Sequence, residues 1–543
     1  MKPLILLLAL SALPLPLKGA DVFVRDGDSG SGAAWNDALD DLPGTLTRGN
    51  TYWIADGNYA GYTFDDAESG TALITVKKAT TAEHGTETGW VSTYGDGQAE
   101  FTGSLKFTSD YWLIDGSTRN ENSWTDVASY GFRCAQGVQM NSSSFGVGNN
   151  VTVQYIDLGS TYDEAPSDAT IDNYSESVYL GFSGIDNFTL SRSHCHNGTP
   201  ALFQNAGATN VLIEYCQFSH GYGKEAIRGQ NTADGMIIRW SRFWNSTQKD
   251  PNDPTSGATA EIGCWSGTHD NMEVYGNFIY NTKTIFHSDA VILIGGNGGS
   301  WPGVGTNNTK VYNNTIAGIK DGQVNIQING GSNNEAKNNL GYDNHTNVGI
   351  GGSPAVATNV NATSDPFVNY AGADFRINSG SEAHDIGTNL GGSPYNLDPL
   401  GVARGQGGGW DVGAYEFDEG TPSLSTAVIP TGGTTIVFTY SESVSIGAGG
   451  NAGFTMSMSG GAVTATYSSG APGTALTYNL SRTVNTGETG THDYTQPGNG
   501  IEATDDAADV ATYTGTSVTN NSTQGGGGGG STLTISGTLT IGP

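Results

Sequence analysis

The chain has 543 residues, a formal net charge of −31 at pH 7 and 81 glycines. This length favours two or three domains, and the acidity disfavours nucleic acid and anionic membranes as partners, because binding to either requires clustered Lys and Arg. The acidity fits either solubility in salty water or carboxylates that hold Ca²⁺. Abundant Gly, Asn, Thr and Ser between short apolar runs indicate an all-β chain with many turns.

Residues 1–20 have the features of a signal peptide. Lys2 supplies the positive charge, residues 4–12 form an apolar run, and Gly19 or Ala20 is a small residue suited to a cleavage site. The run is too short to cross a bilayer, and no later segment reaches about 18 consecutive apolar residues. We therefore expect an exported protein, secreted or held at the cell surface, without a membrane span.

An eleven-residue pattern recurs through the middle of the chain. Asn or a similar residue opens it, apolar residues fill positions two, four and nine, and Asn or a small residue fills position seven. The copies begin at Asn150, Asn187, Asn210, Gly235, Asn271, Asn308 and Asn333. Offsets of 23 to 25 residues suit one turn of short strands, and offsets of 36 or 37 add an inserted loop. Apolar residues two apart indicate strand rather than helix.

These repeats predict a stack of turns. One turn cannot bury its apolar face alone, so we expect the turns to stack as a parallel β-helix with continuous apolar columns at positions two and four. An Asn column at the bends would bond neighbouring turns and tolerate left-handed backbone. Its expected members are Asn197, Asn245 and Asn281.

The two ends of this region carry a family resemblance. The opening is Asp21-Val-Phe-Val, followed by Trp35 and by TYWIADGNYAG from Thr51. The close is Asp398-Pro-Leu-Gly-Val-Ala-Arg404 and then Asp411-Val-Gly-Ala-Tyr-Glu416. Both resemble the pectate-lyase-like superfamily of right-handed parallel β-helices, over residues 21–417. The resemblance implies the fold, whereas the superfamily contains lyases, hydrolases, epimerases, phage tailspikes and adhesins.

Composition shifts after Phe417. Arg482 is the only basic residue from Gly420 onward, and segments such as TTIVFTYSESV from Thr434 alternate like sandwich strands. We predict a small Ig-like β-sandwich over residues 420–523. Residues 524–543 are expected to be a Gly-rich linker and a β-prone tail.

The chain contains four cysteines: Cys134, Cys195, Cys216 and Cys264. Their spacings fit no zinc site. An exported protein can carry one or two disulfides, and small buried thiols stacked in the core are the equal alternative.

Basic residues concentrate between Asn187 and Asp250, a segment that contains six basic residues and only four acidic ones. Aligning the repeats places Glu214 and Arg239 in one column on adjacent turns. The same alignment places His194, Gln217 and Arg242 in a second column. Arg side chains lining a groove would bind the carboxylates of a uronic-acid polymer bidentately. The predicted substrate-binding residues are Arg239, Arg242, His194, His196, Trp240 and Trp244, with packing between turns as the equal alternative for the two tryptophans.

A series of acids precedes the other strand of each turn. Its members are Glu176, Glu225, Glu261, Asp289 and Asp321. If they share an edge, they repel one another unless cations or raised pKa values relieve the repulsion. Oxygen-rich clusters suit Ca²⁺, so Glu225, Glu261 and Asp289 are candidate Ca²⁺ ligands, with ordinary edge residues as the alternative.

The resemblance also implies a reaction, β-elimination. In it a cation, often Ca²⁺, neutralises the uronate carboxylate, and a Lys or Arg removes the C5 proton. A Lys flanked by other cations can have a lowered pKa and act as a base. The candidate catalytic residues are therefore Lys224, Arg228 and His220, with solvated surface ion pairs as the alternative interpretation.

Two classes of function remain open at this point. The leading hypothesis is an exported polysaccharide lyase acting on an acidic uronate polymer such as alginate or pectin. The rival is a non-catalytic glycan-binding adhesin, or a virion or cell-surface fibre protein, which the C-terminal module and tail favour. A hydrolase or epimerase would need paired carboxylates instead of a Lys base. The chain has no Arg-x-Pro-x-x-Arg arrangement of the pectate-lyase type.

Overall fold

The computed structural model describes residues 19–525, apart from 141–147, 161–175, 182–183, 199–200, 205–206, 222–223, 231, 249–259, 265–266, 282–289, 296–304, 321–322, 406–408, 418–421, 448–452, 499 and 505–507. The predicted signal peptide up to residue 18, the predicted tail beyond Gly525, and both Asp289 and Asp321 lie outside the described residues. Within the described part of the chain, no helix is long and apolar enough to cross a membrane.

The chain divides into two compact units. The first contains residues up to Pro366 together with Ser381–Glu416, and the second contains Phe367–Gly380 together with the residues from Phe417 onward. Helices are confined to four single 3-10 turns in the described ranges, at Trp35–Asp37, Ser92–Tyr94, Val127–Ser129 and Tyr370–Gly372.

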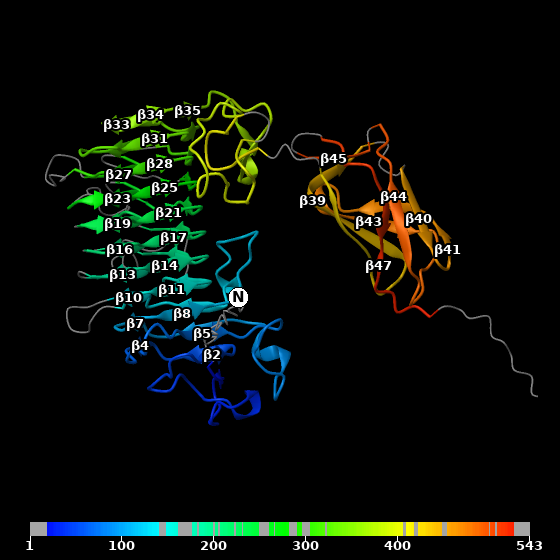
Figure 1. Cartoon of the computed structure of the whole chain (residues 1–543), viewed down its shortest axis with the longest axis horizontal. Coiled ribbons are helices and arrows are strands. Elements are labelled where there is room, and N and C mark those ends of the chain that lie inside the picture. The colour runs from blue at the N-terminus through cyan, green and yellow to red at the C-terminus, as the bar shows by residue number, and fades with distance from the viewer. Residues whose placement is uncertain are drawn as a thin grey trace, which may run out of the picture. The chain divides into compact units, whose positions relative to one another are not determined.

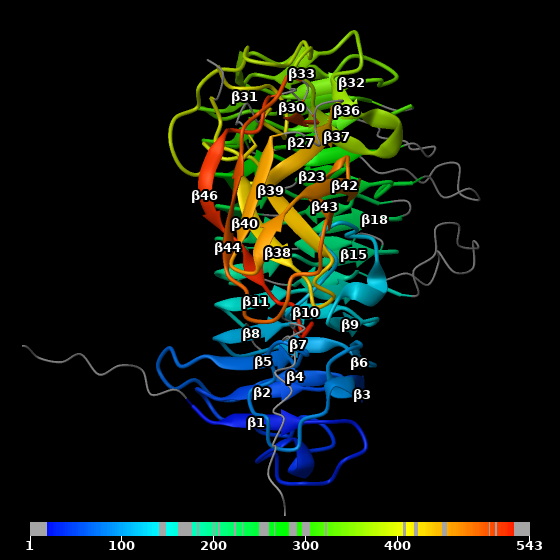
Figure 2. The same cartoon turned by 90° about the vertical axis from the view of Figure 1, so that its right-hand side faces the viewer.

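The first unit consists of three long parallel sheets, here called A, B and C (Figures 1 and 2). Sheet A contains β1 (Asp21–Val24), β2 (Thr51–Ile54), β5 (Ile74–Lys78), β8 (Trp112–Asp115), β11 (Val151–Gln154), β14 (Phe188–Ser191), β17 (Leu212–Glu214), β21 (Ile237–Arg239), β25 (Glu273–Tyr275), β28 (Lys310–Tyr312), β31 (Glu335–Lys337) and β34 (Ala355–Ala357). Sheet B contains β3 (Gly57–Tyr59), β6 (Ala99–Phe101), β9 (Phe132–Cys134), β12 (Ile156–Leu158), β15 (His194–His196), β18 (Gln217–Ser219), β22 (Arg242–Trp244), β26 (Phe278–Tyr280), β29 (Thr315–Ala317), β32 (Leu340–Tyr342) and β35 (Val360–Asn361). Sheet C contains β4 (Tyr62–Phe64), β7 (Leu105–Phe107), β10 (Val138–Met140), β13 (Val178–Leu180), β16 (Leu202–Gln204), β19 (Ile227–Gly229), β23 (Ile262–Cys264), β27 (Ile292–Ile294), β30 (Asn325–Ile328) and β33 (Gly349–Gly352). A short extra pair joins β20 (Ala233–Asp234) and β24 (His269–Asp270).

The chain visits the three sheets in a fixed order. From β2 onward it adds a strand to sheet A, then to B, then to C, and each new strand pairs in parallel with the strand of the preceding turn. Figure 1 shows sheets A and C as stacked rungs, and Figure 2 shows sheet B. This all-β architecture of long parallel sheets fits the predicted parallel β-helix.

The interior is formed by the apolar columns that the repeat predicts. In sheet A, Val153 pairs with Leu190, Leu190 with Ile213, and Ile213 with Ile238. All four side chains are fully buried. Each turn therefore covers its apolar side chains with those of its neighbours, which confirms the expected stacking.

Asparagines at the bends have left-handed backbone. The φ angles of Asn150 and Asn187 are 55° and 57°, and Asn187 Nδ2 donates to Asn150 Oδ1 at 3.2 Å. Of the predicted bend residues, Asn197 and Asn245 have φ angles of 48° and 46°. Asn281 Nδ2 donates to the Thr247 carbonyl of the preceding turn at 2.7 Å. The short amide side chain tolerates this conformation and bonds the next turn.

A second ladder of amides is buried at position seven of the repeat. Asn277 Nδ2 donates to Asn314 Oδ1 at 3.0 Å, and Asn314 Nδ2 donates to Asn339 Oδ1 at 3.0 Å. Asn314 Nδ2 also donates to the Val274 carbonyl, and Asn314 Oδ1 also accepts from the Asn277 backbone amide. These bonds satisfy the polar groups of a side chain that has no exposed surface.

We expect Asn314→Ala to lower the free energy of unfolding by about 2 kcal/mol, because it leaves the buried Asn277 backbone amide without its acceptor and removes the bonds from Asn314 Nδ2 to Asn339 Oδ1 and to the Val274 carbonyl. Urea unfolding followed by circular dichroism measures the change. The control is Asn333→Gly, which removes an exposed rung of the outer ladder and keeps the left-handed backbone. Equal effects of the two substitutions would contradict a special role for the buried ladder.

All four cysteines are buried free thiols. Burial raises the pKa of Cys134 to about 11 and that of Cys264 to about 12. Of the two alternatives left open by the sequence, the structure supports buried thiols rather than disulfides. Protonated, desolvated thiols of this kind behave as small apolar side chains.

Residues 381–405 and 409–416 form a clasp on the outside of the sheets, built from the sequence motif that closes the region. Arg404 and Glu416, each with a side chain 1% exposed, form an ion pair at 3.2 Å. Asp398 accepts from the backbone amides of Leu400 and Val402. Gly413 fits where a Cβ would lie 2.8 Å from Thr315 Oγ1, and its φ of 108° also requires glycine. The motif thus fastens a loop onto β29 and β32.

Glu416 makes the stability of the clasp depend on pH. Burial, reinforced by the charge of Asp411 and opposed by Arg404, raises the pKa of Glu416 to about 7. Between about pH 4.5 and 7 the folded chain then holds this proton more often than the unfolded chain does. The free energy of unfolding therefore falls as pH rises through that window.

We expect the melting temperature to decline from about pH 5 to about pH 8, and the Glu416→Gln variant to have a flatter profile, because its side chain cannot titrate. Calorimetry of both proteins across this range measures the slopes. Parallel profiles for the two proteins would contradict the assignment.

The second unit has its own core between two sheets. One sheet contains β38 (Leu424–Ile429), β39 (Thr435–Ile446), β42 (Ala465–Ser469), β43 (Gly473–Leu480), β45 (Ile501–Ala503) and β47 (Thr519–Asn520). The other contains β40 (Phe454–Met458), β41 (Gly461–Val463), β44 (Gly490–Tyr494) and β46 (Tyr513–Ser517). All these pairs are antiparallel except β38 with β47, and the hairpin β36 (Phe367–Asn369) and β37 (Asp374–Ile377) also belongs to this unit. Phe438 of the first sheet stacks on Phe454 of the second at 4.8 Å.

Candidate functional site

The bend between sheets A and B carries large side chains on left-handed backbone. Position six of the repeat is Tyr155, Arg192, Tyr215 and Trp240 on four consecutive turns, with φ angles between 47° and 54°. This conformation costs of order 1 kcal/mol for a residue other than Gly, Asn or Asp. Strained positions of this kind concentrate at functional sites, so the bend is the first candidate for a binding surface.

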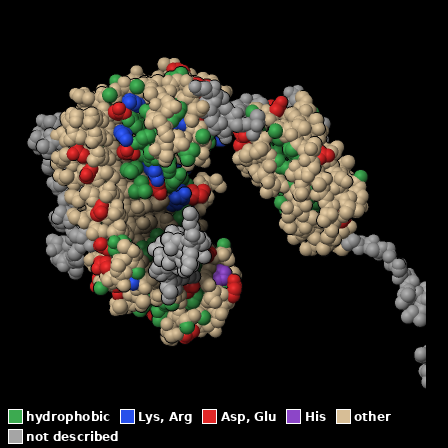
Figure 3. Space-filling model, viewed as in Figure 1, with side chains coloured by type: hydrophobic (Ala, Val, Ile, Leu, Met, Phe, Trp, Pro, Cys, Tyr) green, Lys and Arg blue, Asp and Glu red, His purple; other side chains and the backbone are tan. Residues whose placement is uncertain are grey.

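Cations and aromatic rings alternate along this bend. The Arg192 guanidinium lies 4.5 Å from the Tyr215 ring centroid, and the Tyr215 and Trp240 rings are 5.0 Å apart. The Arg239 guanidinium lies 4.2 Å from the Trp240 ring. We call Tyr155, Arg192, Tyr215, Arg239 and Trp240 the corner strip. Figure 3 shows Lys and Arg side chains in a file among hydrophobic side chains on this face.

Arg239 is held by neighbours in its own column. The register pairs it with Glu214, as the aligned repeats predict, and Arg239 Nε donates to Glu214 Oε2 at 2.9 Å. Arg239 Nη1 donates to the Tyr275 hydroxyl at 2.9 Å. Burial opposes the charge of Arg239, but the Tyr275 hydroxyl and the Glu214 carboxylate outweigh it and raise the pKa of the guanidinium. The side chain is thus a fixed cation with a defined orientation.

A long arm between β8 and β9, residues 116–131, lies over the outer face of sheet B. Its Trp124 ring is sandwiched between the Arg119 and Arg242 guanidinium groups, each 3.9 Å from the ring centroid. Arg119 Nη1 also donates to the Tyr215 carbonyl at 2.5 Å. The arm therefore reaches from the turn of β9 to β22 and contacts the corner strip.

The arm and the clasp flank the strip on two sides. A small pocket between them is lined by Trp124, Trp240, Arg242, Phe278, Leu400 and Tyr415. Leu400 of the clasp remains 57% exposed. Trp124, Phe278 and Tyr415 are buried and Trp240 is half-buried, so Leu400 is the exposed apolar side chain of this lining. An apolar edge beside guanidinium groups and half-buried rings is suited to a ligand that is both ring-shaped and anionic.

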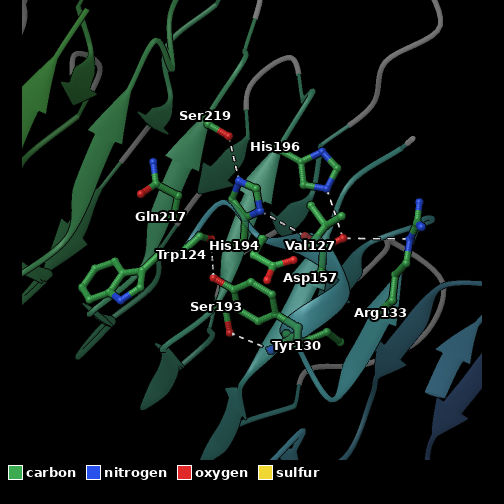
Figure 4. A network of polar contacts seen from close by, with 12 residues as sticks. Trp124, Val127, Tyr130, Arg133, Asp157, Ser193, His194, His196, Gln217 and Ser219 are labelled. Atoms are coloured by element: carbon green, nitrogen blue, oxygen red, sulfur yellow. Dashed lines mark hydrogen bonds and ion pairs between the residues drawn. The ribbon is translucent and has the colours of Figure 1, made fainter. Parts of the chain in front are cut away.

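Beneath the arm lies a buried cluster of one carboxylate and two imidazoles (Figure 4). Asp157 Oδ1 lies 3.1 Å from His194 Nδ1, and Asp157 Oδ2 lies 3.2 Å from His196 Nε2. Tyr130 of the arm packs against the His194 ring with centroids 6.1 Å apart. Burial lowers the pKa of His194 to about 4, despite its bond to Asp157. Burial also opposes the charge of Asp157, but the two histidines outweigh it and lower the pKa of this carboxyl.

The structure separates the residues that the sequence groups as substrate-binding. Register places His194, Gln217 and Arg242 in one column, as predicted. His194 and His196 nevertheless have no exposed surface, because the arm lies over them, so they are not part of a surface groove in this conformation. Arg242 and Trp240 face the pocket, whereas Trp244 packs beside Tyr280 on sheet B with ring centroids 4.7 Å apart.

The candidate catalytic residues lie elsewhere, on or before sheet C. Lys224 is exposed on the loop before β19, and Arg228 within β19 has its Nε 3.8 Å from Glu225 Oε2. His220 is buried at the bend between sheets B and C, with a φ of 53°. The corner strip lies at the bend between sheets A and B, whereas the predicted base Lys224 lies before sheet C. The two therefore belong to different faces of the turn.

Of the three candidate Ca²⁺ ligands, Glu225 and Glu261 are described and Asp289 lies outside the described residues, so the Ca²⁺ site stays a prediction. Glu225 and Glu261 are both buried, and the Ser246 hydroxyl donates to Glu261. Ile227 pairs with Ile262, so Ala226 rather than Glu225 lies beside Glu261. Among the residues described, the groups compact enough to hold a metal ion are Asp157–His194–His196 and His384–Asp385–Asp411.

The sequence interpretation did not use several residues of the site. The corner strip occupies position six of the repeat, so a search of that column for large residues would have found Tyr155, Arg192 and Tyr215. Asp157 occupies position eight of its copy, the column of His194, Gln217 and Arg242, so alignment of the copies would also have found it. Trp124 carried no such signal, because it lies in an insertion outside the repeats. The sequence matches no protein-family model and no curated protein.

We expect Trp124→Ala to loosen the arm, because it removes the ring that both guanidinium groups contact. Hydrogen exchange measured by mass spectrometry should show faster exchange over residues 117–131 and in peptides containing His194. Trp244→Ala, a ring of equal size on the same sheet, serves as the control. Unchanged exchange in the Trp124 variant would contradict the clamping role of this residue.

Proposed function

We propose that this chain is an exported carbohydrate-active protein that binds an acidic polysaccharide along the corner strip. The single observation that carries the proposal is the alternation of guanidinium groups with aromatic rings on consecutive turns, in a chain whose net charge is −31. Guanidinium groups bind carboxylates bidentately, and aromatic faces pack on sugar rings. Neighbouring turns are about 4.8 Å apart, so the binding groups of the strip recur at short, regular intervals along the stack.

The finer assignment of the fold is also part of the proposal. The opening and closing motifs support a right-handed β-helix of the pectate-lyase-like superfamily. The two sheets of the second unit around one core support the Ig-like sandwich predicted over residues 420–523. A sandwich module joined to a β-helix through a short segment would suit attachment or extra glycan contacts.

The reaction that the resemblance implies, β-elimination of a uronate polymer, is our leading candidate activity. Lys224 would be the base, Arg228 and His220 its neighbours, and Ca²⁺ held by Glu225, Glu261 and Asp289 the cofactor. The exposure of Lys224 beside a cation–carboxylate pair supports this assignment. Such a reaction site would lie on the side of sheet C, and the corner strip would be an additional binding surface.

The second candidate is a glycan-binding adhesin or cell-surface fibre protein without catalysis. Two observations favour it. The Arg239 guanidinium is already committed to Glu214 and Tyr275. Burial raises the pKa of Tyr215, so its hydroxyl stays protonated near neutral pH and does not act as a base there.

Binding is tested with alginate and pectate oligosaccharides by calorimetry. We expect Arg192→Asn to weaken binding about tenfold, or about 1.4 kcal/mol, because it removes one cation and keeps a residue that tolerates the left-handed bend. The matched control is Lys320→Ala, which removes an exposed cation that pairs with Asp343 outside the strip. Equal weakening in both variants would indicate nonspecific charge attraction and contradict the strip as the binding site.

The same polymers separate the two candidate functions. A lyase releases unsaturated uronate products that absorb in the ultraviolet, and we expect this signal to require Ca²⁺ and to vanish in Lys224→Ala. Binding without any such product, with and without Ca²⁺, would support the non-catalytic alternative and remove the catalytic role of Lys224.

A further inference from the structure

We propose that Asp157, His194 and His196 form a binding site for a divalent transition-metal ion such as Zn²⁺. Each offers one ligand atom, and the three atoms lie within 4.8 Å of one another. This inference does not depend on the proposed polysaccharide binding. It also differs from the Ca²⁺ site expected at Glu225, Glu261 and Asp289, because its residues and its ligand chemistry are different.

The parallel register brings the three ligands together. Asp157 of β12 pairs directly with His194 of β15, and His196 lies two residues further along the same strand and hence on the same face. Tetrahedral zinc with bonds of about 2.0–2.1 Å separates its ligand atoms by roughly 3.3 Å. The contacts of 3.1 Å and 3.2 Å from Asp157 to the two imidazoles are close to that separation.

The outer nitrogen of each imidazole already has a hydrogen-bond partner. His194 Nε2 lies 2.7 Å from the Ser219 hydroxyl, and His196 Nδ1 lies 2.8 Å from Asn197 Oδ1. Metal-bound histidines generally donate their second N–H to such an oxygen, which fixes the tautomer and the ring orientation. Figure 4 shows the two rings converging on the Asp157 carboxylate.

The chemistry of the donors selects the class of metal. Two imidazoles and one carboxylate suit zinc and its neighbours, whereas Ca²⁺ prefers sites made only of oxygen. Arg133 Nε lies 3.9 Å from Asp157 Oδ2 and 4.0 Å from Glu100 Oε1, so Glu100 shares the charge of this guanidinium. Because the three ligands are fully buried, the ion joins two adjacent turns beneath the arm.

The test uses the full chain, purified without a histidine tag and stripped of metal with a chelator. Zinc chloride is titrated in a calorimeter and the melting temperature is recorded, because an ion that binds only the folded chain stabilises it. We expect one Zn²⁺ per chain, a melting temperature several degrees higher, and tetrahedral absorption bands when Co²⁺ replaces Zn²⁺. No uptake by the natural chain, with no shift in melting temperature, would overturn the proposal and leave a simple hydrogen-bonded triad.

Variants locate the ion. His196→Gln and Asp157→Asn should each abolish stoichiometric uptake, whereas His384→Gln should retain it, because His384 belongs to the other compact His–Asp group. Loss of uptake in His384→Gln with retention in His196→Gln would overturn the assignment. The titration of the natural chain decides the matter even if a variant of the buried cluster fails to fold.

Discussion

The in-register stacking of turns is the constraint on which the rest of the first unit depends. A single turn buries almost nothing by itself, so each strand must pair with the strands of the turns on both sides. Parallel register then repeats every position of the turn at the spacing of one strand. Inward positions become apolar columns or amide ladders, as at Asn314, and outward positions become columns of like or complementary side chains, as at Glu214 and Arg239.

The same constraint gives the bends their importance. A bend residue has no freedom to move along the stack, because the strands on both sides are fixed by pairing. Large residues such as Arg192 and Trp240 therefore keep left-handed backbone and form an ordered strip. The arm, which lies within one turn, and the clasp, which follows the last turn, are not part of the regular strands, and they flank this strip. In such a fold, a binding surface is expected where the regular columns of side chains lie beside irregular loops.

The sequence predicted the regular stacked strands of this structure and little about the loops that lie on them. Offsets between copies predicted the stacked turns, and alignment of the copies predicted the Glu214–Arg239 pair and the column of His194, Gln217 and Arg242. Alignment cannot reveal what an insertion covers, so the burial of His194 beneath the arm was not foreseen. Alignment of the copies also does not give the register of Glu225 and Glu261, which are offset by one residue between neighbouring turns. Both precede strands of sheet C, and the eleven-residue pattern does not include those strands.

The most direct test of the account is a map of where a uronate oligosaccharide protects backbone amides from hydrogen exchange. The account predicts slower exchange in peptides that contain Tyr215 and Trp240 and in the arm around Trp124, with peptides from the core of the second unit unchanged. Protection restricted to the side of sheet C around Lys224 and Arg228, or no protection in the presence of saturating ligand, would contradict the corner strip as the binding surface.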